Sequence, residues 1–287
     1  MKLGYNTNGF AHHRIEDALR ILADMGYTAV AVTLEPTFFH PPDAPGVRDC
    51  VKRLSSALAP THLLPTIETG SRFILDSNRK HHPTLVSARP EDRQRRIDFI
   101  CAAIDIAAEI GAAAVSLWSG RPDDVTPDHA HSDEVVWERL TVSLEPILRH
   151  AESRRIRLAF EPEPDMFIDA MTKFDRLHQS LPHPLLGLTL DVGHVHCLED
   201  GRPADHIRRW KHLLWNIHIE DMRRGRHEHL LFGQGDMDFP PIFSALREIR
   251  YDGPLHVELS RHSHDAVNLA RLSFEFLKRM VEPTSSP

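Results

Sequence analysis

Four apolar segments of this 287-residue sequence deliver a side chain that can bind a metal ion. The segments are Arg157–Glu161, Leu188–His194, Leu214–His218 and Leu255–Glu258, and they supply Glu161, Asp191, His218 and Glu258. Three carboxylates and one imidazole form an oxygen-rich ligand set that suits Mn²⁺, Mg²⁺ or Co²⁺ and is acceptable to Zn²⁺ or Fe²⁺. Without a cation, like-charge repulsion would force at least one carboxylate to take up a proton. The pattern therefore predicts a site for one divalent metal ion.

The placement of these residues at the ends of apolar runs indicates how they would meet. Parallel strands all end at one edge of a sheet or one mouth of a barrel, so polar residues at their carboxyl ends converge there. The alternative is that each acid caps a helix or pairs with a nearby arginine. Four successive strand ends carrying ligands favour a shared site.

The elements that would position these ligands alternate along the whole chain. Further strands are predicted at Lys2–Tyr5, Ala29–Leu34, Leu63–Glu68 and Ala113–Trp118, and helices are predicted near residues 15–25, 47–59, 97–108, 133–153, 172–181, from 203, 240–249 and 267–277. The strands are continuous apolar runs, which is typical of strands covered on both faces. About eight strand–helix units favour a (β/α)8 TIM barrel over a doubly wound open sheet. No linker divides the chain, so we expect one domain over residues 1–280 and a flexible tail over 281–287.

The composition, with 41% hydrophobic and 26% charged residues, indicates a soluble globular protein. No apolar run approaches the ~18 residues that a membrane span needs, and the amino terminus lacks the apolar region of a secretion signal. The three cysteines are too few and too scattered for a disulfide framework, so we expect a cytoplasmic protein. A formal net charge of −7 makes nucleic acid an unfavourable partner.

Three motifs resemble those of a known family, the xylose isomerase-like barrels. The motifs are Leu190–His194, Ile217–Asp221 and His229–Gly235. This family includes ketose 3-epimerases, hydroxypyruvate isomerases, keto-inositol dehydratases and endonuclease IV. The resemblance implies that Glu161, Asp191, His218 and Glu258 hold one divalent metal, for which Mn²⁺ is the family's usual ion. It also implies that His194 and Arg224 hydrogen-bond substrate oxygens and that Asp221 orients neighbouring groups.

The chemistry of such a site starts with a weakly acidic proton next to a carbonyl. A 2-keto sugar can chelate the metal through its carbonyl and a neighbouring hydroxyl, and the metal then stabilises the enediolate that forms. Glu161 and Glu258 would act as the catalytic acid and base on the two sides of the reacting carbon. Epimerisation, isomerisation and dehydration are all compatible with these residues. The main alternative to an isomerase or epimerase is therefore a lyase of the keto-inositol or dehydroshikimate dehydratase type.

Two further histidines, His227 and His229, are expected on a long loop after the His218 strand. In endonuclease IV the corresponding loop supplies an Asp-x-His pair to a three-metal cluster, and here His227 replaces the aspartate. That enzyme also takes histidines from the third and fourth strand regions, where this chain has Glu68 and Trp118. These departures argue against a full trinuclear cluster and a nuclease. Substrate contact and a solvated loop both remain open for His227 and His229.

Several other residues could contact substrate from the predicted strand ends. Asn6, Glu68 and Arg72 could reach sugar hydroxyls, and Trp118 could stack on a sugar ring or simply pack. The epimerases carry a further substrate-binding glutamate where this chain has Phe167, and the nearby Glu163 cannot be assumed to replace it. The basic stretch Ser71–Leu85 could close over a phosphate or carboxylate, although a solvated loop is the simpler interpretation.

The sequence thus predicts a metal-dependent isomerase or epimerase for a small keto sugar or related polyol. A lyase on the same site, an endonuclease IV-like phosphodiesterase and a barrel that only binds a metabolite are the alternatives. No membrane is expected as a partner, and a homo-oligomer is left open.

Overall fold

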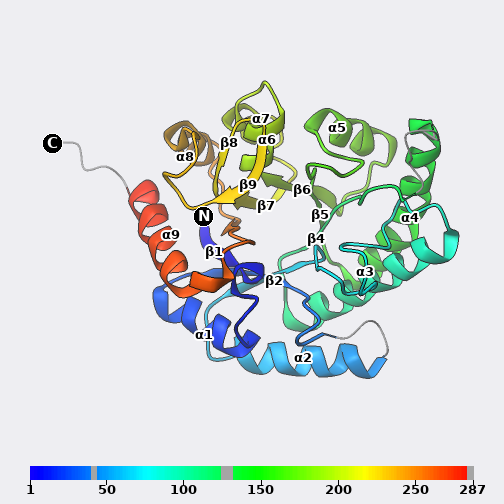
Figure 1. Cartoon of the computed structure of the whole chain (residues 1–287), viewed down its shortest axis with the longest axis horizontal. Coiled ribbons are helices and arrows are strands. Elements are labelled where there is room, and N and C mark those ends of the chain that lie inside the picture. The colour runs from blue at the N-terminus through cyan, green and yellow to red at the C-terminus, as the bar shows by residue number, and fades with distance from the viewer. Residues whose placement is uncertain (40–43, 124–131, 283–287) are drawn as a thin grey trace.

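Eight parallel strands close into a barrel in the computed structural model, which describes residues 1–39, 44–123 and 132–282 (Figure 1). Around the barrel the order is β1, β2, β3, β4, β5, β6, β7 and β10, which pairs again with β1. Their bounds are β1 Lys2–Asn6, β2 Ala29–Thr33, β3 Leu64–Glu68, β4 Val115–Leu117, β5 Leu158–Phe160, β6 Leu186–Asp191, β7 Leu214–Ile219 and β10 Pro254–Val257. This closed parallel sheet confirms the predicted (β/α)8 barrel.

Helices surround the barrel and cover the outer faces of its strands (Figure 1). The α-helices are α1 Ile15–Met25, α2 Ala44–Leu58, α3 Pro90–Ile110, α4 Asp133–Arg154, α5 Met171–Ser180, α6 Val192–Leu198, α7 Pro203–Arg209, α8 Phe239–Glu248 and α9 Ala266–Val281, with 3-10 helices η1 Thr7–Phe10 and η2 Ser263–Asp265. Because helices or barrel packing cover both faces, a strand such as β2 is buried at every position. None of the helices in the described part of the chain is long and apolar enough to cross a membrane.

Glycine ends the first and third helices where the sequence indicated a stop. Gly26 and Gly111 follow α1 and α3 with φ of 99° and 69°. This left-handed conformation is strained for residues that carry a Cβ atom. These two turns return the chain to β2 and β4 and so set the alternation of strand and helix.

Two elements near the predicted ligands differ from the sequence expectation. The chain after Asp191 turns directly into α6, and the Asp191 carboxylate caps this helix by accepting a hydrogen bond from the His194 N–H at 2.9 Å. The expected long loop after His218 contains an antiparallel hairpin of β8 Asp221–Arg223 and β9 Arg226–Leu230. His229 therefore lies on a strand and is buried, which corrects the loop prediction.

The connections that follow barrel strands lie at the carboxyl ends of those strands. Of the connection between β2 and α2, residues 40–43 lie outside the described residues. The predicted tail falls mainly on residues 283–287, which are also outside them, and α9 still includes Val281.

Candidate functional site

The four predicted metal ligands come together at the carboxyl end of the barrel. Glu161 follows β5, Asp191 ends β6, His218 lies on β7 and Glu258 follows β10. One ligand atom from each lies within 4.8 Å of those of the others. Three of the residues are almost fully buried, with 4% of Glu161, 2% of Asp191 and 1% of His218 exposed. The barrel thus concentrates three carboxyl groups in a space that water barely reaches.

His218 lies at the centre of this group. Its Nδ1 is 2.9 Å from both Glu161 Oε1 and Glu258 Oε2. Burial favours the neutral ring, but the adjacent carboxylates Glu161 and Glu68 outweigh it and hold the pKa of His218 well above its usual value. A proton on His218 therefore offsets part of the negative charge, and a metal ion bound through Nδ1 would replace that proton.

The three carboxyl groups around His218 differ in their pKa values and in their hydrogen bonds. Burial raises the pKa of Glu161 to about 7 against the opposing effect of His218. Burial acts in the same direction on Glu258, but the hydrogen bond and charge of His218 lower its pKa well below the usual value. Asp191 Oδ2 is buried without a hydrogen-bond partner among the described residues. A divalent cation fits this donor set because it would satisfy the orphaned oxygen and compensate the carboxylates together.

Glu68 fixes the opposite edge of the His218 ring. Glu68 Oε1 lies 3.0 Å from His218 Nε2 and accepts a hydrogen bond from Asn216 Nδ2 at 3.2 Å. The Asn216 side-chain oxygen in turn lies 2.8 Å from His256 Nδ1. Such contacts orient a histidine so that its other nitrogen faces a metal. Sequence reasoning assigned Glu68 to substrate alone and did not identify Asn216, which lies two residues before His218 on the same face of β7.

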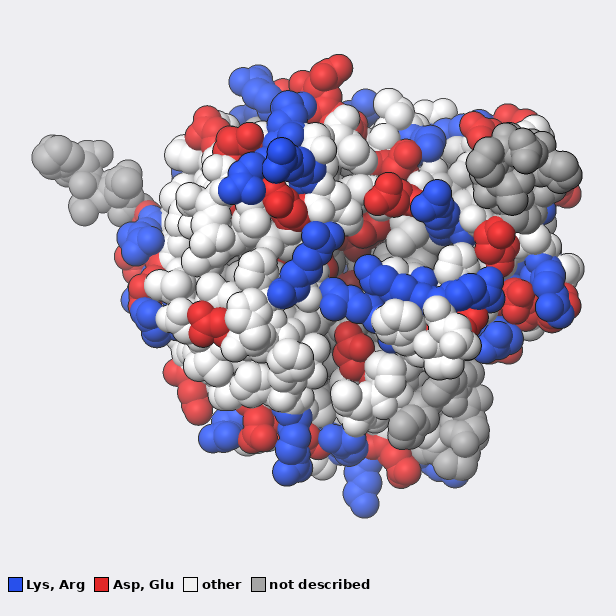
Figure 2. Space-filling model, viewed as in Figure 1, with Lys and Arg blue, Asp and Glu red and all other residues white. Residues whose placement is uncertain are grey.

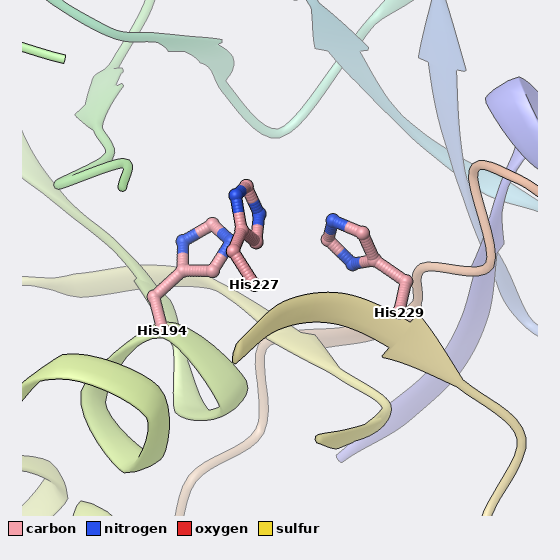
Figure 3. A group of neighbouring side chains, drawn as sticks. All are labelled: His194, His227 and His229. Atoms are coloured by element: carbon pink, nitrogen blue, oxygen red, sulfur yellow. The ribbon is translucent and has the colours of Figure 1, made fainter. Parts of the chain in front are cut away.

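A second group of unsatisfied side chains lies beside the four ligands. His194 rises from α6, whereas His227 and His229 come from β9, and the three rings gather in one place (Figure 3). Their ring centroids are 4.9 to 5.8 Å apart. His194 Nε2, His227 Nε2 and His229 Nδ1 are buried and lack hydrogen-bond partners among the residues that the structure describes. Three convergent nitrogens can bind substrate oxygens, and their spacing would also admit a metal ion.

The histidines differ in protonation because their neighbours differ. Burial favours the neutral form of all three rings. For His194, Asp191 and Glu163 outweigh burial and raise the pKa to about 9. For His227 burial dominates and lowers the pKa to about 3, and for His229 it lowers the pKa to about 4. The group therefore offers one cationic donor and two neutral rings to a ligand.

Glu163 is a pocket residue whose role the sequence left undecided. Its Oε2 lies 3.7 Å from His194 Nδ1 and its Oε1 lies 3.8 Å from His227 Nε2. Burial raises the pKa of Glu163 to about 8. Phe167 instead packs against Trp137 at a centroid distance of 5.2 Å and does not line the pocket. The structure therefore places a carboxyl group close to the ligands through Glu163.

Glu220 is a buried acid that sequence reasoning passed over. Both of its carboxyl oxygens are buried without a hydrogen-bond partner among the described residues. Oε1 lies 3.8 Å from His229 Nδ1, which is too long for a hydrogen bond. Burial raises its pKa well above the usual value, and Asp191 adds to the effect. The only sequence signal was its position directly after the apolar part of β7. In its neutral form, the Glu220 carboxyl group offers a hydrogen-bond donor close to His229.

Most of the predicted substrate contacts surround one pocket at this end of the barrel. It encloses a cavity of about 80 Å³ that opens to solvent. The lining includes the predicted residues Asn6, Glu68, Arg72, Trp118, His227 and His229, and Lys80 from the basic stretch Ser71–Leu85. It also includes Asn8, Glu35, Glu163 and Arg261, which were not assigned to substrate. Figure 2 shows acidic side chains (red) inside a central hollow and basic side chains (blue) at its edge.

Arg224 is not brought to this pocket, in contrast to the expectation for it. It is exposed at the turn of the β8–β9 hairpin, where its Nη1 donates to the Glu199 carbonyl at 2.7 Å. Gly225, the next residue, adopts the φ of 74° that this tight turn requires. The cations that do line the pocket are Arg72, Lys80 and Arg261.

Asp221 holds the segment that follows the hairpin. Its carboxylate accepts hydrogen bonds from the N–H groups of Met222, Gly233, Gly235 and Met237 at 2.7 to 3.2 Å. Gly235 is required there, because a Cβ atom would lie 2.3 Å from Asp221 Oδ1. This arrangement agrees with the expectation that Asp221 orients its neighbours, and the neighbours are backbone groups.

Known proteins of similar sequence and structure share this architecture. Fructoselysine 3-epimerase of Shigella flexneri is 24% identical and the match covers 90% of each chain. Inosose dehydratase of Lacticaseibacillus casei is 26% identical over 47% of this chain and 50% of its own. The crystal structure of IolI protein with a bound zinc atom superposes with a TM-score of 0.74 at 16% identity, covering all of both chains. The model of the xylose isomerase-like TIM barrel family matches residues 19–280, so the chain belongs to that family.

Proposed function

We propose that this chain is a divalent-metal-dependent isomerase or epimerase that acts on a small keto sugar or related polyol. The observation that carries the proposal is the convergence of one ligand atom each from Glu161, Asp191, His218 and Glu258 within 4.8 Å, where Glu161, His218 and Glu258 line a polar pocket. One relative that matches over 90% of its length is named fructoselysine 3-epimerase, and the zinc-bound IolI structure is consistent with a divalent ion. Mn²⁺ is the ion that we propose, with Mg²⁺, Co²⁺, Zn²⁺ and Fe²⁺ compatible with the same ligands.

The metal would be held by Glu161, Asp191, His218 and Glu258. When bound, it would polarise the substrate carbonyl and stabilise an enediolate. Glu161 and Glu258 follow strands β5 and β10, which are separated in the barrel by β6 and β7. One of the two carboxyl groups removes the proton next to the carbonyl, and the other returns a proton to the opposite face.

The other pocket residues bind and orient the sugar. His227 and His229 line the pocket and His194 lies beside them. One nitrogen of each ring has no hydrogen-bond partner among the described residues and contacts substrate oxygens in this proposal. Trp118 is 7% exposed and offers an apolar edge, while Asn6 and Arg72 provide polar contacts from the first and third strand ends. Burial of the reacting carbons excludes water and strengthens each of these interactions.

The second candidate is a lyase that uses the same site to remove a hydroxyl group. The similarity to inosose dehydratase favours it, although that match covers only about half of each chain. Glu163 supports it chemically, because burial keeps its carboxyl group protonated near neutral pH and thus able to protonate a departing hydroxyl.

The two candidates are separated by incubating the Mn²⁺-loaded protein with ketoses and inososes in deuterated water. Deuterium in the recovered sugar is the expected result and supports an isomerase or epimerase. A dehydrated product would instead establish the lyase, and binding without either change would leave only a metabolite-binding barrel. Glu161→Gln and Glu258→Gln should each abolish exchange, whereas Glu275→Gln, on the outer helix α9, should not. Cleavage of abasic DNA would contradict the proposal in favour of a phosphodiesterase.

A further inference from the structure

Three cationic side chains at the pocket mouth form no ion pair with an acid among the described residues. Arg72 follows β3, Lys80 lies in the connection between β3 and α3, and Arg261 follows β10, yet all three line the same pocket. Among the residues that the structure describes, none of them has a carboxylate oxygen within 4.0 Å. Arg79, next to Lys80 in the chain, contrasts with them because its Nε lies 2.7 Å from Asp76 Oδ2. The three cations are therefore free to bind an anion.

Backbone contacts bring these cations together. Arg72 Nη2 donates at 3.0 Å to the carbonyl of Ser260, the residue directly before Arg261. Arg261 Nη2 donates at 3.2 Å to the carbonyl of His227. Each guanidinium uses one nitrogen in this way and keeps further N–H groups for a ligand. Burial lowers the pKa of Lys80 and Arg72 adds to the effect, as expected for cations that lie close together.

A buried arginine forms hydrogen bonds with the backbone of the connection that carries Arg72 and Lys80. Arg96 on α3 is 2% exposed and donates to the carbonyls of His81 and Pro83, each at 2.7 Å, and of Thr69 at 3.4 Å. Its guanidinium also lies 5.1 Å from the ring centre of Trp118. The cations are therefore presented by a fixed segment, which lowers the entropy cost of binding.

These cations are more exposed to solvent than the proposed catalytic groups. Lys80 and Arg261 are exposed and Arg72 is partly exposed, whereas Glu161 and His218 are almost fully buried. A substrate whose reacting carbons reach the floor would place its far end among the cations. The mouth also contains Glu35 and Glu163, and in the described part of the chain neither carboxylate lies within 4.0 Å of a nitrogen of these cations.

We propose that Arg72, Lys80 and Arg261 form an anion subsite and that the substrate is a keto sugar with a phosphate or carboxylate at the end remote from the carbonyl. Guanidinium groups bind both anions through paired N–H donors, and an ammonium adds a compact charge. The proposal rests on the proposed function for the sugar part of the ligand, but the anion subsite can be tested without turnover.

The first test measures binding of inorganic phosphate to the metal-free full-length chain by calorimetry at constant ionic strength. Removing the metal ensures that phosphate cannot bind to it. We expect saturable binding that becomes at least about tenfold weaker in Arg72→Gln and in Arg261→Gln. Arg79→Gln removes the same charge from the same connection and should bind like the parent chain. Absence of saturable binding, or an equal loss in Arg79→Gln, would overturn the subsite.

The second test identifies the anion with three matched sugars and the Mn²⁺-loaded protein. Fructose, fructose 6-phosphate and fructuronate differ only at the carbon remote from the carbonyl, where they carry a hydroxyl, a phosphate and a carboxylate. We expect one of the two anionic sugars to bind at least about tenfold more tightly than fructose, with the preference reduced in Arg72→Gln. Equal binding of all three sugars would overturn the proposal.

The two proposals fail in different ways. If deuterium enters a neutral ketose but the anionic sugars gain no affinity, the subsite is wrong and the proposed function stands. If phosphate binding depends on Arg72 and Arg261 but no sugar exchanges deuterium, the subsite stands and the proposed function is wrong.

Discussion

His218 is the residue on which the charge balance of the site depends. It contacts Glu161 and Glu258 through one nitrogen and Glu68 through the other, so three acids share one imidazole. A carboxylate that fixes the outer nitrogen of a metal-binding histidine typically changes metal affinity by about 10–100-fold. Glu68 should therefore act on the metal even though it would not bind it directly.

We predict that Glu68→Gln lowers Mn²⁺ affinity by about 10–100-fold, because glutamine fixes the ring of His218 less strongly than a carboxylate does. Calorimetric titration of the metal-free protein with Mn²⁺ measures the change. Glu35→Gln is the matched control, since Glu35 lines the same pocket and, in the described part of the chain, forms neither a hydrogen bond nor an ion pair with His218. Unchanged affinity in Glu68→Gln would show that Glu68 serves substrate alone.

At the scale of elements, the β8–β9 hairpin depends on Asp221 for its connection to α8. Asp221→Ala would leave four backbone N–H groups without their acceptor. We predict a loss of about 3 kcal/mol in the free energy of unfolding, measured in urea. Asp205→Ala, at an exposed position on α7, should change it little. A loss in Asp221→Ala no larger than in this control would contradict the proposed role.

The connection between β3 and α3 depends in the same way on Arg96. Arg96→Met keeps an apolar contact with Trp118 but removes the donors to three carbonyl groups. We predict a loss of about 3 kcal/mol in unfolding free energy and faster proteolysis within residues 69–89. Arg149→Met, on the exposed face of α4, is the comparison. Proteolysis at the same rate in both variants would argue against this role.

The barrel elements could be predicted from sequence because their signals are local. Continuous apolar runs mark strands such as β2, and stripes that end at Gly26 and Gly111 mark α1 and α3. The α6 helix and the β8–β9 hairpin could not be predicted in this way. α6 has only seven residues and begins with the Asp191 cap, while the hairpin is polar and its strands pair only with each other.

The candidate ligands could be predicted for a related reason, and their partners could not. A ligand at a strand end is visible as a change from apolar to polar residues. The contacts of Glu68 with His218 and of Glu163 with His194 join positions that are far apart in the chain or belong to different elements. Only closure of the barrel brings them together. Arg224 shows the converse, because a basic residue near the motif is directed outward by a turn.

At the scale of the whole molecule, the site links four strands that are distant in sequence. A metal ion that binds Glu161, Asp191, His218 and Glu258 would connect β5, β6, β7 and β10, which are consecutive in the closed sheet. Such an ion binds the folded barrel and has no equivalent site in the unfolded chain. Metal binding should therefore stabilise the whole barrel as well as support the proposed chemistry.

We predict that Mn²⁺ at 100 times its dissociation constant stabilises the folded chain by about 2.7 kcal/mol and raises its melting temperature by roughly 5 °C. Chelation should reverse the shift, and Asp191→Asn should abolish it at the same Mn²⁺ concentration. In the metal-free fold the pKa of His218 is raised, so below that pKa Mn²⁺ must displace a proton. At one fixed Mn²⁺ concentration, the shift should consequently be smaller at pH 6 than at pH 8, because proton competition weakens Mn²⁺ binding. Differential scanning calorimetry at both pH values measures it, and an equal shift in Asp191→Asn would contradict the proposed ligand set.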